Sequence, residues 1–583
     1  MVIDELRPLY THTHRGDAHV DVQTRQEEFY FGPEELALYG VLHLPVDDRV
    51  RGAVLICGSI AKEQTDACRG LRMLGDALAR RRIAVMRFDY AGTGDSADCQ
   101  VRHDTVARWC ASIGLAVDHL AGLGIESITG IGLRVGSLLL DAVLPDQPRI
   151  DRVVHWDPVG RGRSFVREQQ ALHRLSVAAE DGYTGENVPL IGATLSSTAA
   201  KELSEIEFVG SGDHVRARLM ATRPEVTDKR VRAVCARPEV DVVTVEGMPE
   251  FIAPDSFLVA LPVAAIDEIV EWVDTRTTTV VDSIDTTDLR HDARMSVPNP
   301  LGGSSTEVVE HIEHIGAHGL FAVRTSPADA RTTVDNPKTV VFFATANDLH
   351  VGPNREWVDL ARQVAAAGGQ ALRFDRTGAG ETGPVVAGPT SIYSTEAIGE
   401  ALAAVRHASS DPSRVLVTGV CSGSWYSAYV ARELHTGAAV LINSIAWSWR
   451  RKRSAEGNVR PEDLGVPRSD PEWQKTPRAR IKSGLRRRLP YPLWRELGRR
   501  GITQIPEILV RPLVKAGVDT TLVLSPHDYG WYVDQRGPEG LARIDPTMRR
   551  PRLISVGSGD HSAFHESVRT AVRAPILDWI TSP

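Results

Sequence analysis

The chain has 583 residues, a length that suits two large domains better than one. Hydrophobic residues make up 42% and charged residues 24%, a balance that excludes a disordered chain, a collagen-like repeat and a coiled-coil rod. The formal net charge of -8 argues against a protein that binds nucleic acid.

The first segment, residues 1–25, lacks the apolar stretch of a signal peptide. No run in the chain reaches the roughly 18 to 20 apolar residues that a membrane-spanning helix needs. We therefore expect a cytoplasmic protein without a membrane span. The six cysteines form no CxxC pair, so the sequence indicates neither a zinc site nor a disulfide framework.

An internal repeat organises the chain. Residues 87–94, RFDYAGTG, return as RFDRTGAG at residues 373–380, and GLRVG at 132–136 is answered by GVCSG at 419–423. The two matches lie 286 and 287 residues apart, which indicates a duplicated unit.

Each half contains short β-branched runs separated by helix-like segments rich in Ala, Leu and Arg. Strands that alternate with helices predict a mostly parallel, doubly wound α/β sheet. We predict two tandem domains at 26–275 and 306–583, preceded by an extension at 1–25. The Thr- and Asp-rich stretch 276–305 is predicted as the linker.

The second copy of the short glycine motif carries a candidate nucleophile. Cys421 lies between Gly419 and Gly423, after an apolar run and before a helix-like segment. Glycines on both sides permit a tight strand-to-helix turn that exposes the central side chain above the sheet. We predict that Cys421 is a nucleophile, and the alternative is a buried structural thiol.

Its partners are expected later in the chain, acid first and histidine second. Asp528 follows one predicted strand and His561 the next. The histidine would take the thiol proton, and the carboxylate would fix its tautomer. The alternatives at these positions are His527, His565, Asp534 and Asp560. The oxyanion hole is expected from the amide of Ser422 and a second donor near Ala346 and Asn347.

The first half has Arg134 where the second has Cys421. A guanidinium stays protonated and cannot act as a nucleophile, so we interpret this half as a degenerate copy. Asp241 is a candidate relic of its acid, and no histidine follows the last predicted strand. A separate hypothesis is that Arg134 binds a phosphate or a carboxylate.

No bound cofactor or metal is predicted. The glycine motifs lack the spacing of a nucleotide-binding loop. His311, His314 and His318 are spaced like metal ligands, but scattered surface histidines are the favoured interpretation.

These motifs resemble the α/β-hydrolase superfamily, in particular hydrolases associated with exosortase and exopolysaccharide gene clusters. The resemblance is carried by RFDYAGTGDS at 87–96, HVGPNR at 350–355, VCSGS at 420–424 and the pair Asp560-His561. It implies a core sheet with a helical cap insertion in each half, and a Cys or Ser nucleophile with Asp and His. A cysteine nucleophile in this fold is also similar to polyester synthases and dienelactone hydrolases.

A basic stretch at about 445–505 falls where the second cap would be inserted. Residues 450–500 contain sixteen Lys and Arg against six Asp and Glu. This charge suits coenzyme A or an acidic acyl carrier protein, and the alternative is a solvated cap that balances the acidic remainder.

We expect an enzyme that transfers an acyl group from a thioester or ester donor to an acceptor in a biosynthetic pathway, with a small-molecule acyl substrate. A thioester intermediate on Cys421 remains reactive toward amines and alcohols, which favours transfer. Hydrolysis of an ester or thioester by the same triad is the first alternative. A non-catalytic ligand-binding or scaffold protein is the alternative from another class.

Overall fold

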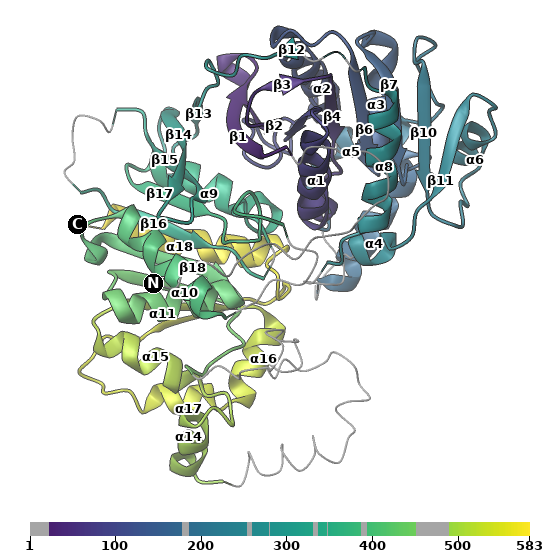
Figure 1. The fold of residues 1–583 in the computed structure, drawn as a ribbon. Coiled ribbons are helices and arrows are strands. Elements are labelled where there is room, and N and C mark those ends of the chain that lie inside the picture. The colour runs from purple at the N-terminus through teal and green to yellow at the C-terminus, as the bar shows by residue number, and fades with distance from the viewer. Residues whose placement is uncertain are drawn as a thin grey trace, which may run out of the picture.

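A computed structural model describes residues 22–177, 186–252, 259–278, 280, 282–329, 336–346, 348–385, 393–449 and 489–582. Each half of the chain builds one large sheet with helices packed against both faces (Figure 1). The predicted fold class, an α/β fold of two tandem domains with mostly parallel sheets, is confirmed.

The first sheet has eight strands in the order β1-β2-β5-β4-β6-β7-β10-β11. The pairs β1/β2 and β2/β5 are antiparallel, and all later pairs are parallel. The strands are β1 (Thr24–Phe31), β2 (Leu38–Pro45), β4 (Ala53–Cys57), β5 (Ala84–Phe88), β6 (Ile128–Leu133), β7 (Ile150–Trp156), β10 (Ala217–Thr222) and β11 (Val240–Thr244).

The second sheet repeats this order and adds one strand at the edge, giving β13-β14-β15-β17-β16-β18-β19-β20-β21. Its strands are β13 (Asp292–Val297), β14 (Thr306–Ile315), β15 (Leu320–Pro327), β16 (Thr339–Phe343), β17 (Gln370–Phe374), β18 (Val415–Val420), β19 (Ala438–Ile442), β20 (Asp519–Leu524) and β21 (Arg552–Ser555). The central strands β4 and β16 are buried at every residue, as parallel strands covered on both faces are.

Two strands fall within 276–305, the stretch predicted as a linker. The short β12 (Asp282–Ser283) pairs with β3 (Arg49–Val50), and β13 pairs with β14. In β13 the apolar residues Ala293, Met295 and Val297 alternate with polar ones, the pattern of a half-buried strand. The linker prediction is therefore wrong over β13, where this alternation outweighs the polar composition of the stretch.

Helices cover each sheet in two layers. In the first half they are α1 (Lys62–Arg80), α2 (Thr105–Gly122), α3 (Val135–Val143), α4 (Gly162–Ser176), α5 (Ser197–Glu205), α6 (Lys229–Cys235), α7 (Met248–Phe251) and α8 (Val263–Arg276). In the second half they are α9 (Glu356–Ala366), α10 (Thr395–Ala408), α11 (Ser422–Leu434), α14 (Tyr491–Arg499), α15 (Pro506–Lys515), α16 (Pro526–Asp534), α17 (Gly537–Ala542) and α18 (Glu566–Thr581). Short 3-10 turns lie at 34–36, 144–146, 353–355 and 412–414.

A cap-like insertion interrupts each half between the sixth and seventh strands of the shared order. In the first half it contains α4, α5 and the hairpin of β8 (Asn187–Leu190) and β9 (Ala193–Ser196). In the second half it contains α14 and α15, and residues 450–488 of the predicted basic cap lie outside the described residues.

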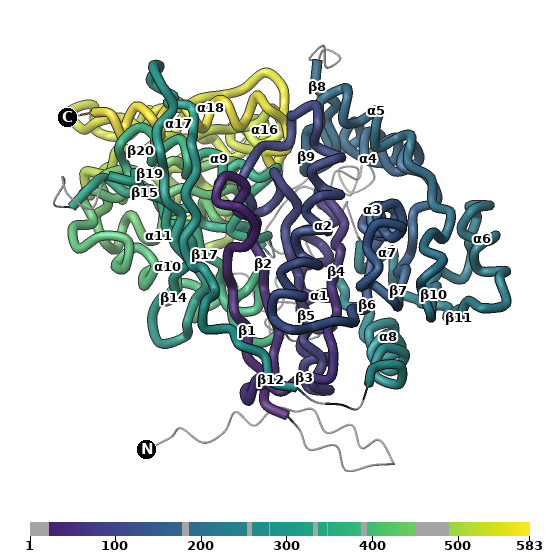
Figure 2. Tube along the Cα trace, turned by 90° about the horizontal axis from the view of Figure 1, so that it is seen from above, coloured from purple at the N-terminus to yellow at the C-terminus, as the bar shows by residue number. Residues whose placement is uncertain are grey.

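The two halves contact each other through strands near one edge of each sheet. Figure 2 shows β1 and β2 beside strands of the second half, and the rings of Tyr39 on β2 and Phe321 on β15 lie 5.9 Å apart. The buried residues at this contact also include Tyr30, Val41, Ile312 and Val323. A small apolar core therefore joins the halves.

Two ion pairs beside this core are equivalent to each other: in one the arginine comes from the first half, and in the other it comes from the second half. Arg87 donates to Glu381 at 3.0 and 2.6 Å, and Arg373 pairs with Asp95. Arg373 and Glu381 each stand 286 residues after Arg87 and Asp95. A contact in which i meets j and j meets i is isologous, the geometry of a two-fold dimer. The halves thus face each other as the subunits of a symmetric dimer do.

Candidate active site

Cys421 lies on a strained turn between β18 and α11. Its backbone has φ 54° and ψ -110°, a conformation that residues other than glycine rarely adopt. The neighbouring glycines allow β16 to pass close by: a Cβ atom added at Gly423 would lie 2.6 Å from the Phe343 carbonyl oxygen, and one at Gly419 would lie 2.8 Å from it. The Cys421 side chain is partly exposed on this turn.

The predicted acid and histidine lie beside each other. Asp528 is in the first turn of α16, just after β20, and His561 follows β21. The distance between His561 Nδ1 and Asp528 Oδ1 is 2.8 Å. Asp528 is completely buried and also accepts a hydrogen bond from the Ser525 hydroxyl at 2.5 Å.

The electrostatics of the pair suit a protonated histidine beside a carboxylate. Burial alone would raise the pKa of Asp528, but the charge on His561 and its hydrogen bond hold that pKa below its ordinary value. Burial alone would lower the pKa of His561, but Asp528 and Cys421 raise it well above its ordinary value. One of these effects on His561 is a side-chain hydrogen bond with Cys421, so the structure brings the three predicted residues together.

The alternative residues lie in other places. Asp560 accepts the backbone N–H groups of Phe564 and His565 at 3.1 and 2.8 Å, which shapes the histidine loop. His565 caps α18 by accepting the Ser567 N–H at 3.1 Å. His527 and Asp534 are exposed on α16. These contacts favour His561 and Asp528 over the alternatives.

One of the predicted oxyanion donors, the Ala346 N–H, already has an acceptor at the turn. The Ala346 N–H, in the loop after β16, donates to Ser422 Oγ at 3.0 Å, and the Thr345 and Ser422 hydroxyl oxygens lie 3.1 Å apart. Ala346 is therefore directed at the residue that follows Cys421. The other predicted donor of this loop, Asn347, lies outside the described residues.

Asn443 belongs to this site, and the sequence analysis missed it. It follows β19 with φ 46°, and its side chain is completely buried. Its Nδ2 donates to the carbonyls of Asp560 and His561 at 2.9 and 2.8 Å, and its Oδ1 accepts the Ser525 N–H at 2.8 Å. One amide therefore ties the histidine loop to the acid loop. The available signal was its distance of 286 residues from Asp157, which follows the matching strand β7 in the same way.

Arg134 has the same strained backbone as Cys421, with φ 53° and ψ -120°. Its buried guanidinium lies 3.1 Å from Glu63, 3.0 Å from Glu168 and 3.5 Å from Asp157. Burial alone would lower the pKa of Arg134, but these carboxylates raise it above its ordinary value. Because its charge is matched within its own half, the geometry does not favour the hypothesis that Arg134 binds an anion.

The interpretation of Asp241 as a relic acid is wrong. Asp241 lies on β11, the last strand of its sheet, where it accepts from the Trp272 indole at 2.7 Å and from Arg276 at 2.8 Å. The loop that matches the one carrying Asp528 follows β10. Its first residue is Arg223, which pairs with Asp157 at 2.7 Å. The sequence alone could not show that the acid position belongs after β10 and not on β11, because charged residues follow both strands.

Two of the three spaced histidines pair with carboxylates of nearby strands. His311 lies 2.7 Å from Asp292, and His314 lies 3.3 Å from Glu28. Across the described ranges, no group of three or more His, Cys, Asp or Glu side chains is arranged to hold a metal ion.

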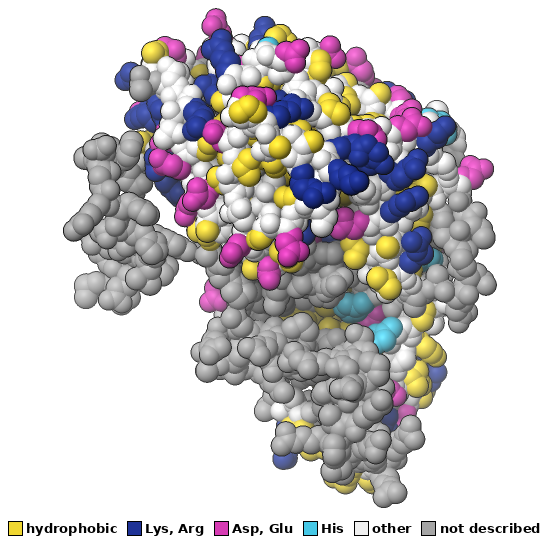
Figure 3. Space-filling view, turned by 90° about the vertical axis from the view of Figure 1, so that its right-hand side faces the viewer, with side chains coloured by type: hydrophobic (Ala, Val, Ile, Leu, Met, Phe, Trp, Pro, Cys, Tyr) yellow, Lys and Arg dark blue, Asp and Glu magenta, His cyan; other side chains and the backbone are white. Residues whose placement is uncertain are grey.

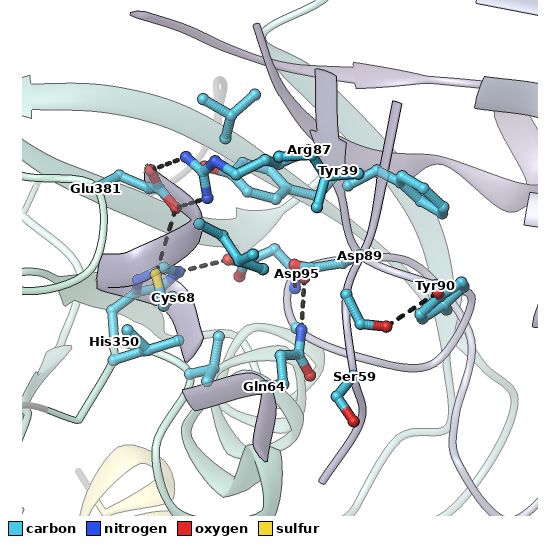
Figure 4. Close-up of a pocket in the computed structure, with 18 residues that line it drawn as sticks. Tyr39, Ser59, Gln64, Cys68, Arg87, Asp89, Tyr90, Asp95, His350 and Glu381 are labelled. Atoms are coloured by element: carbon cyan, nitrogen blue, oxygen red, sulfur yellow. Dashed lines mark hydrogen bonds and ion pairs between the residues drawn. The ribbon is translucent and has the colours of Figure 1, made fainter. Parts of the chain in front are cut away.

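A small cavity of about 70 Å³ lies between the halves. Figure 4 shows its polar lining, with Arg87 reaching Glu381 and Gln64 reaching Asp89, and His350 of the second half beside Asp95 of the first. None of the three triad candidates lines this cavity. Figure 3 shows histidine side chains exposed in the hollow below the first half, on the side of the molecule that faces the viewer.

No protein-family model matches the sequence, and no curated protein does. Among solved structures, the esterase domain of a Rhodothermus marinus protein is 18% identical, with 43% of this chain and 98% of that chain covered and a TM-score of 0.28. An esterase of Pyrococcus furiosus is 15% identical, with coverage of 44% and 90% and a TM-score of 0.28. The bottromycin epimerase BotH is 15% identical, with coverage of 43% and 99% and a TM-score of 0.29. Likenesses this weak assign no activity.

Within the described part of the chain, no helix combines the length and the apolar character needed to cross a bilayer.

Proposed function

We propose that the chain is an acyl-transferring enzyme of the α/β-hydrolase fold, with Cys421 as nucleophile, His561 as general base and acid, and Asp528 as its carboxylate partner. The observation that carries the proposal is the chain of contacts from Asp528 to His561 to Cys421 at the strained turn. A structural thiol needs no such partners.

The first chemical step follows from these positions. His561 takes the proton of the Cys421 thiol, and the thiolate attacks the carbonyl carbon of an ester or thioester. The negative charge that develops on the carbonyl oxygen is stabilised by the backbone amide of Ser422, whose hydroxyl is held by the Ala346 N–H. The bond to the leaving group then breaks, and His561 returns the proton to the departing oxygen or sulfur. The product is a thioester between the acyl group and Cys421.

The second step decides the class of reaction. An acceptor hydroxyl, amine or thiol gives its proton to His561 and attacks the Cys421 thioester, which releases the acylated product and restores the thiol. Water in the same position gives hydrolysis. Transfer is our preferred outcome because a thioester is more reactive toward such acceptors than an ester is. A coenzyme A or carrier-protein donor remains a proposal that rests on the basic sequence of the cap.

Intact-mass measurement tests the covalent step. The wild type is incubated with a panel of acyl thioesters, beside Cys421→Ala, His561→Ala and a control, Cys99→Ala, which removes an exposed cysteine of the first half. We expect an acyl adduct on the wild type and on the control, none on Cys421→Ala, and slow formation on His561→Ala. Adding amines, alcohols or water then separates transfer from hydrolysis.

A wild type that forms no adduct and has an unreactive Cys421 thiol would contradict the proposal. That result would favour the non-catalytic ligand-binding protein instead.

A further inference from the structure

We infer that the first half completes the active site of the second: Asp95 holds His350, and His350 in turn positions the loop whose Ala346 N–H holds Ser422, the residue whose own amide is the expected oxyanion donor. This inference rests on the proposed function. It gives the half without a nucleophile a role in the reaction, with Asp95 and His350 as positioning residues that do not touch the reacting atoms.

His350 is buried between two carboxylates that belong to different halves. Its Nδ1 lies 2.8 Å from Asp375 Oδ2, and its backbone N–H donates to Asp375 Oδ1 at 2.8 Å. Its Nε2 pairs with Asp95 of the first half (Figure 4). Asp95 is buried as well, and its other oxygen pairs with Arg373. A rotation of the imidazole ring would therefore break at least one of its two contacts with a carboxylate.

Hydrogen bonds also hold the other end of this loop, at Ala346, beside the proposed nucleophile. The Ala346 carbonyl accepts a hydrogen bond from Arg376 Nε at 2.9 Å, while its N–H points to Ser422. The Asp348 N–H donates to the Thr345 carbonyl at 2.7 Å, which closes a tight turn between the two ends. A displacement of His350 is thus passed through a short, hydrogen-bonded turn to the Ala346 amide.

The first half supplies an internal comparison. Gln64 stands 286 residues before His350, and Asp89 stands 286 residues before Asp375. Gln64 Nε2 donates to Asp89 Oδ1 at 2.6 Å, so it makes the contact within its own half that His350 makes to Asp375. A histidine has nitrogen atoms on two sides of its ring and can also bridge to a second carboxylate. His350, which bridges the carboxylates of the two halves, thus belongs to the half that carries the proposed nucleophile.

Holding the halves together does not depend on this bridge alone. Arg87 binds Glu381, Arg72 donates to the Gly380 carbonyl, and Arg355 Nε donates to the Gly94 carbonyl at 2.7 Å. Removing one contact of His350 should leave the halves joined while loosening the loop of Ala346.

The test is the variant His350→Gln, which places in the second half the residue that the first half already uses. Turnover of p-nitrophenyl acetate needs the oxyanion donors, whereas alkylation of Cys421 by iodoacetamide forms no oxyanion. We expect kcat to fall by about tenfold or more with KM changed by less than about twofold, because a misplaced donor weakens transition-state binding. The alkylation rate should stay within about twofold of the wild-type rate.

Two further variants sharpen the result. Asp95→Asn removes the charge from the other side of the same contact and should also lower kcat, with a double variant no worse than the larger single effect. Arg87→Gln breaks the ion pair that mirrors Arg373 with Asp95 and should retain the wild-type kcat in the folded fraction.

The outcomes are distinguishable. Wild-type kcat in His350→Gln overturns the inference and leaves the proposed function standing. An equal fall in turnover and alkylation marks a merely structural role and also overturns it. A wild type that is neither alkylated at Cys421 nor active on the ester defeats the proposed function, and the inference fails with it.

Discussion

Three hydrogen bonds converge on the side chain of Asn443, and they join the two loops that present the acid and the histidine. The variant Asn443→Ala leaves those backbone groups without their partner. A buried polar group left unpaired costs about 1–3 kcal/mol, so we expect the free energy of unfolding to fall by about 2–4 kcal/mol. Urea unfolding of the full chain measures this change. A loss below about 0.5 kcal/mol would show that water replaces the amide freely.

The Asp528 carboxylate is expected to influence how fast Cys421 reacts. Burial alone would lower the pKa of His561, and Asp528 raises it well above its ordinary value, which favours a protonated histidine beside Cys421. Asp528→Asn removes that charge at nearly constant size. The rate at which iodoacetamide alkylates Cys421 at pH 7 should fall by about tenfold, because the histidine loses the charge that favours its protonated form.

Alkylation rates of the wild type and the variant at pH 7 measure this change, and Asp534→Asn is the control because Asp534 is exposed at the end of the same helix. A wild-type rate in Asp528→Asn would show that the carboxylate does not act on the thiol.

At the scale of elements, the close approach of α11 to β16 determines where glycine is required. Gly423→Ala would bring a methyl group to 2.6 Å from the Phe343 carbonyl, so the helix must move away from the strand. We expect a loss of about 1–3 kcal/mol in the free energy of unfolding, as overpacked sites show. Slower acylation of Cys421 should accompany it, because the strained turn moves with the helix.

Gly399, inside α10, is the matched control. An added methyl group there meets nothing within 4 Å, so Gly399→Ala should stabilise the chain by about 0.5–1 kcal/mol through its higher helix propensity. Thermal or urea unfolding of both variants measures the two changes. A change of the same sign in both would contradict the packing argument.

Much of the fold was predictable because the signals are local. The run AVLIC of β4 and the run TVVFF of β16 are apolar along their whole length, and the glycines around Cys421 marked the turn at the sheet edge. Strand β13 was not predicted, because its alternating pattern of apolar residues lies in a stretch of polar composition. Asp528 and His561 were predicted from the order in which an acid and a histidine follow the late strands of such a sheet, and the structure places the two side chains 2.8 Å apart.

Contacts between distant residues were not predictable in the same way. Asn443 is an ordinary residue after a strand until the loops of Ser525 and Asp560 are placed around it. His350 and Asp95 are 255 residues apart, and neither carries a local sign of the other. Such pairs depend on how the sheets meet, and one sequence does not encode this in any short pattern.

At the scale of the whole molecule, the buried charge of His350 links stability to pH. Burial alone would lower the pKa of His350, but Asp375 and Asp95 raise it to about 10. A folded-state pKa above the unfolded value of about 6.5 means that the protonated form stabilises the fold. This contribution is complete below about pH 6.5, declines as the pH rises, and is lost above about pH 10.

We therefore expect the free energy of unfolding of the wild type to exceed that of His350→Gln most at pH 6 and to approach it near pH 10. Urea unfolding at pH 6, 8 and 10 measures the difference between the two chains. A difference that stays constant over this range would show that His350 is neutral in the folded protein.

The isologous contact between the halves also bears on how two unlike halves arose. In a symmetric dimer of identical chains, every substitution is made twice, so loss of the nucleophile in one subunit is loss in both. Placing both copies on one chain separates their inheritance. The residue pairs Gln64 and His350, and Arg134 and Cys421, show such independent change at matching positions. Covalent linkage thus permits a division of labour that a dimer of one gene product cannot reach.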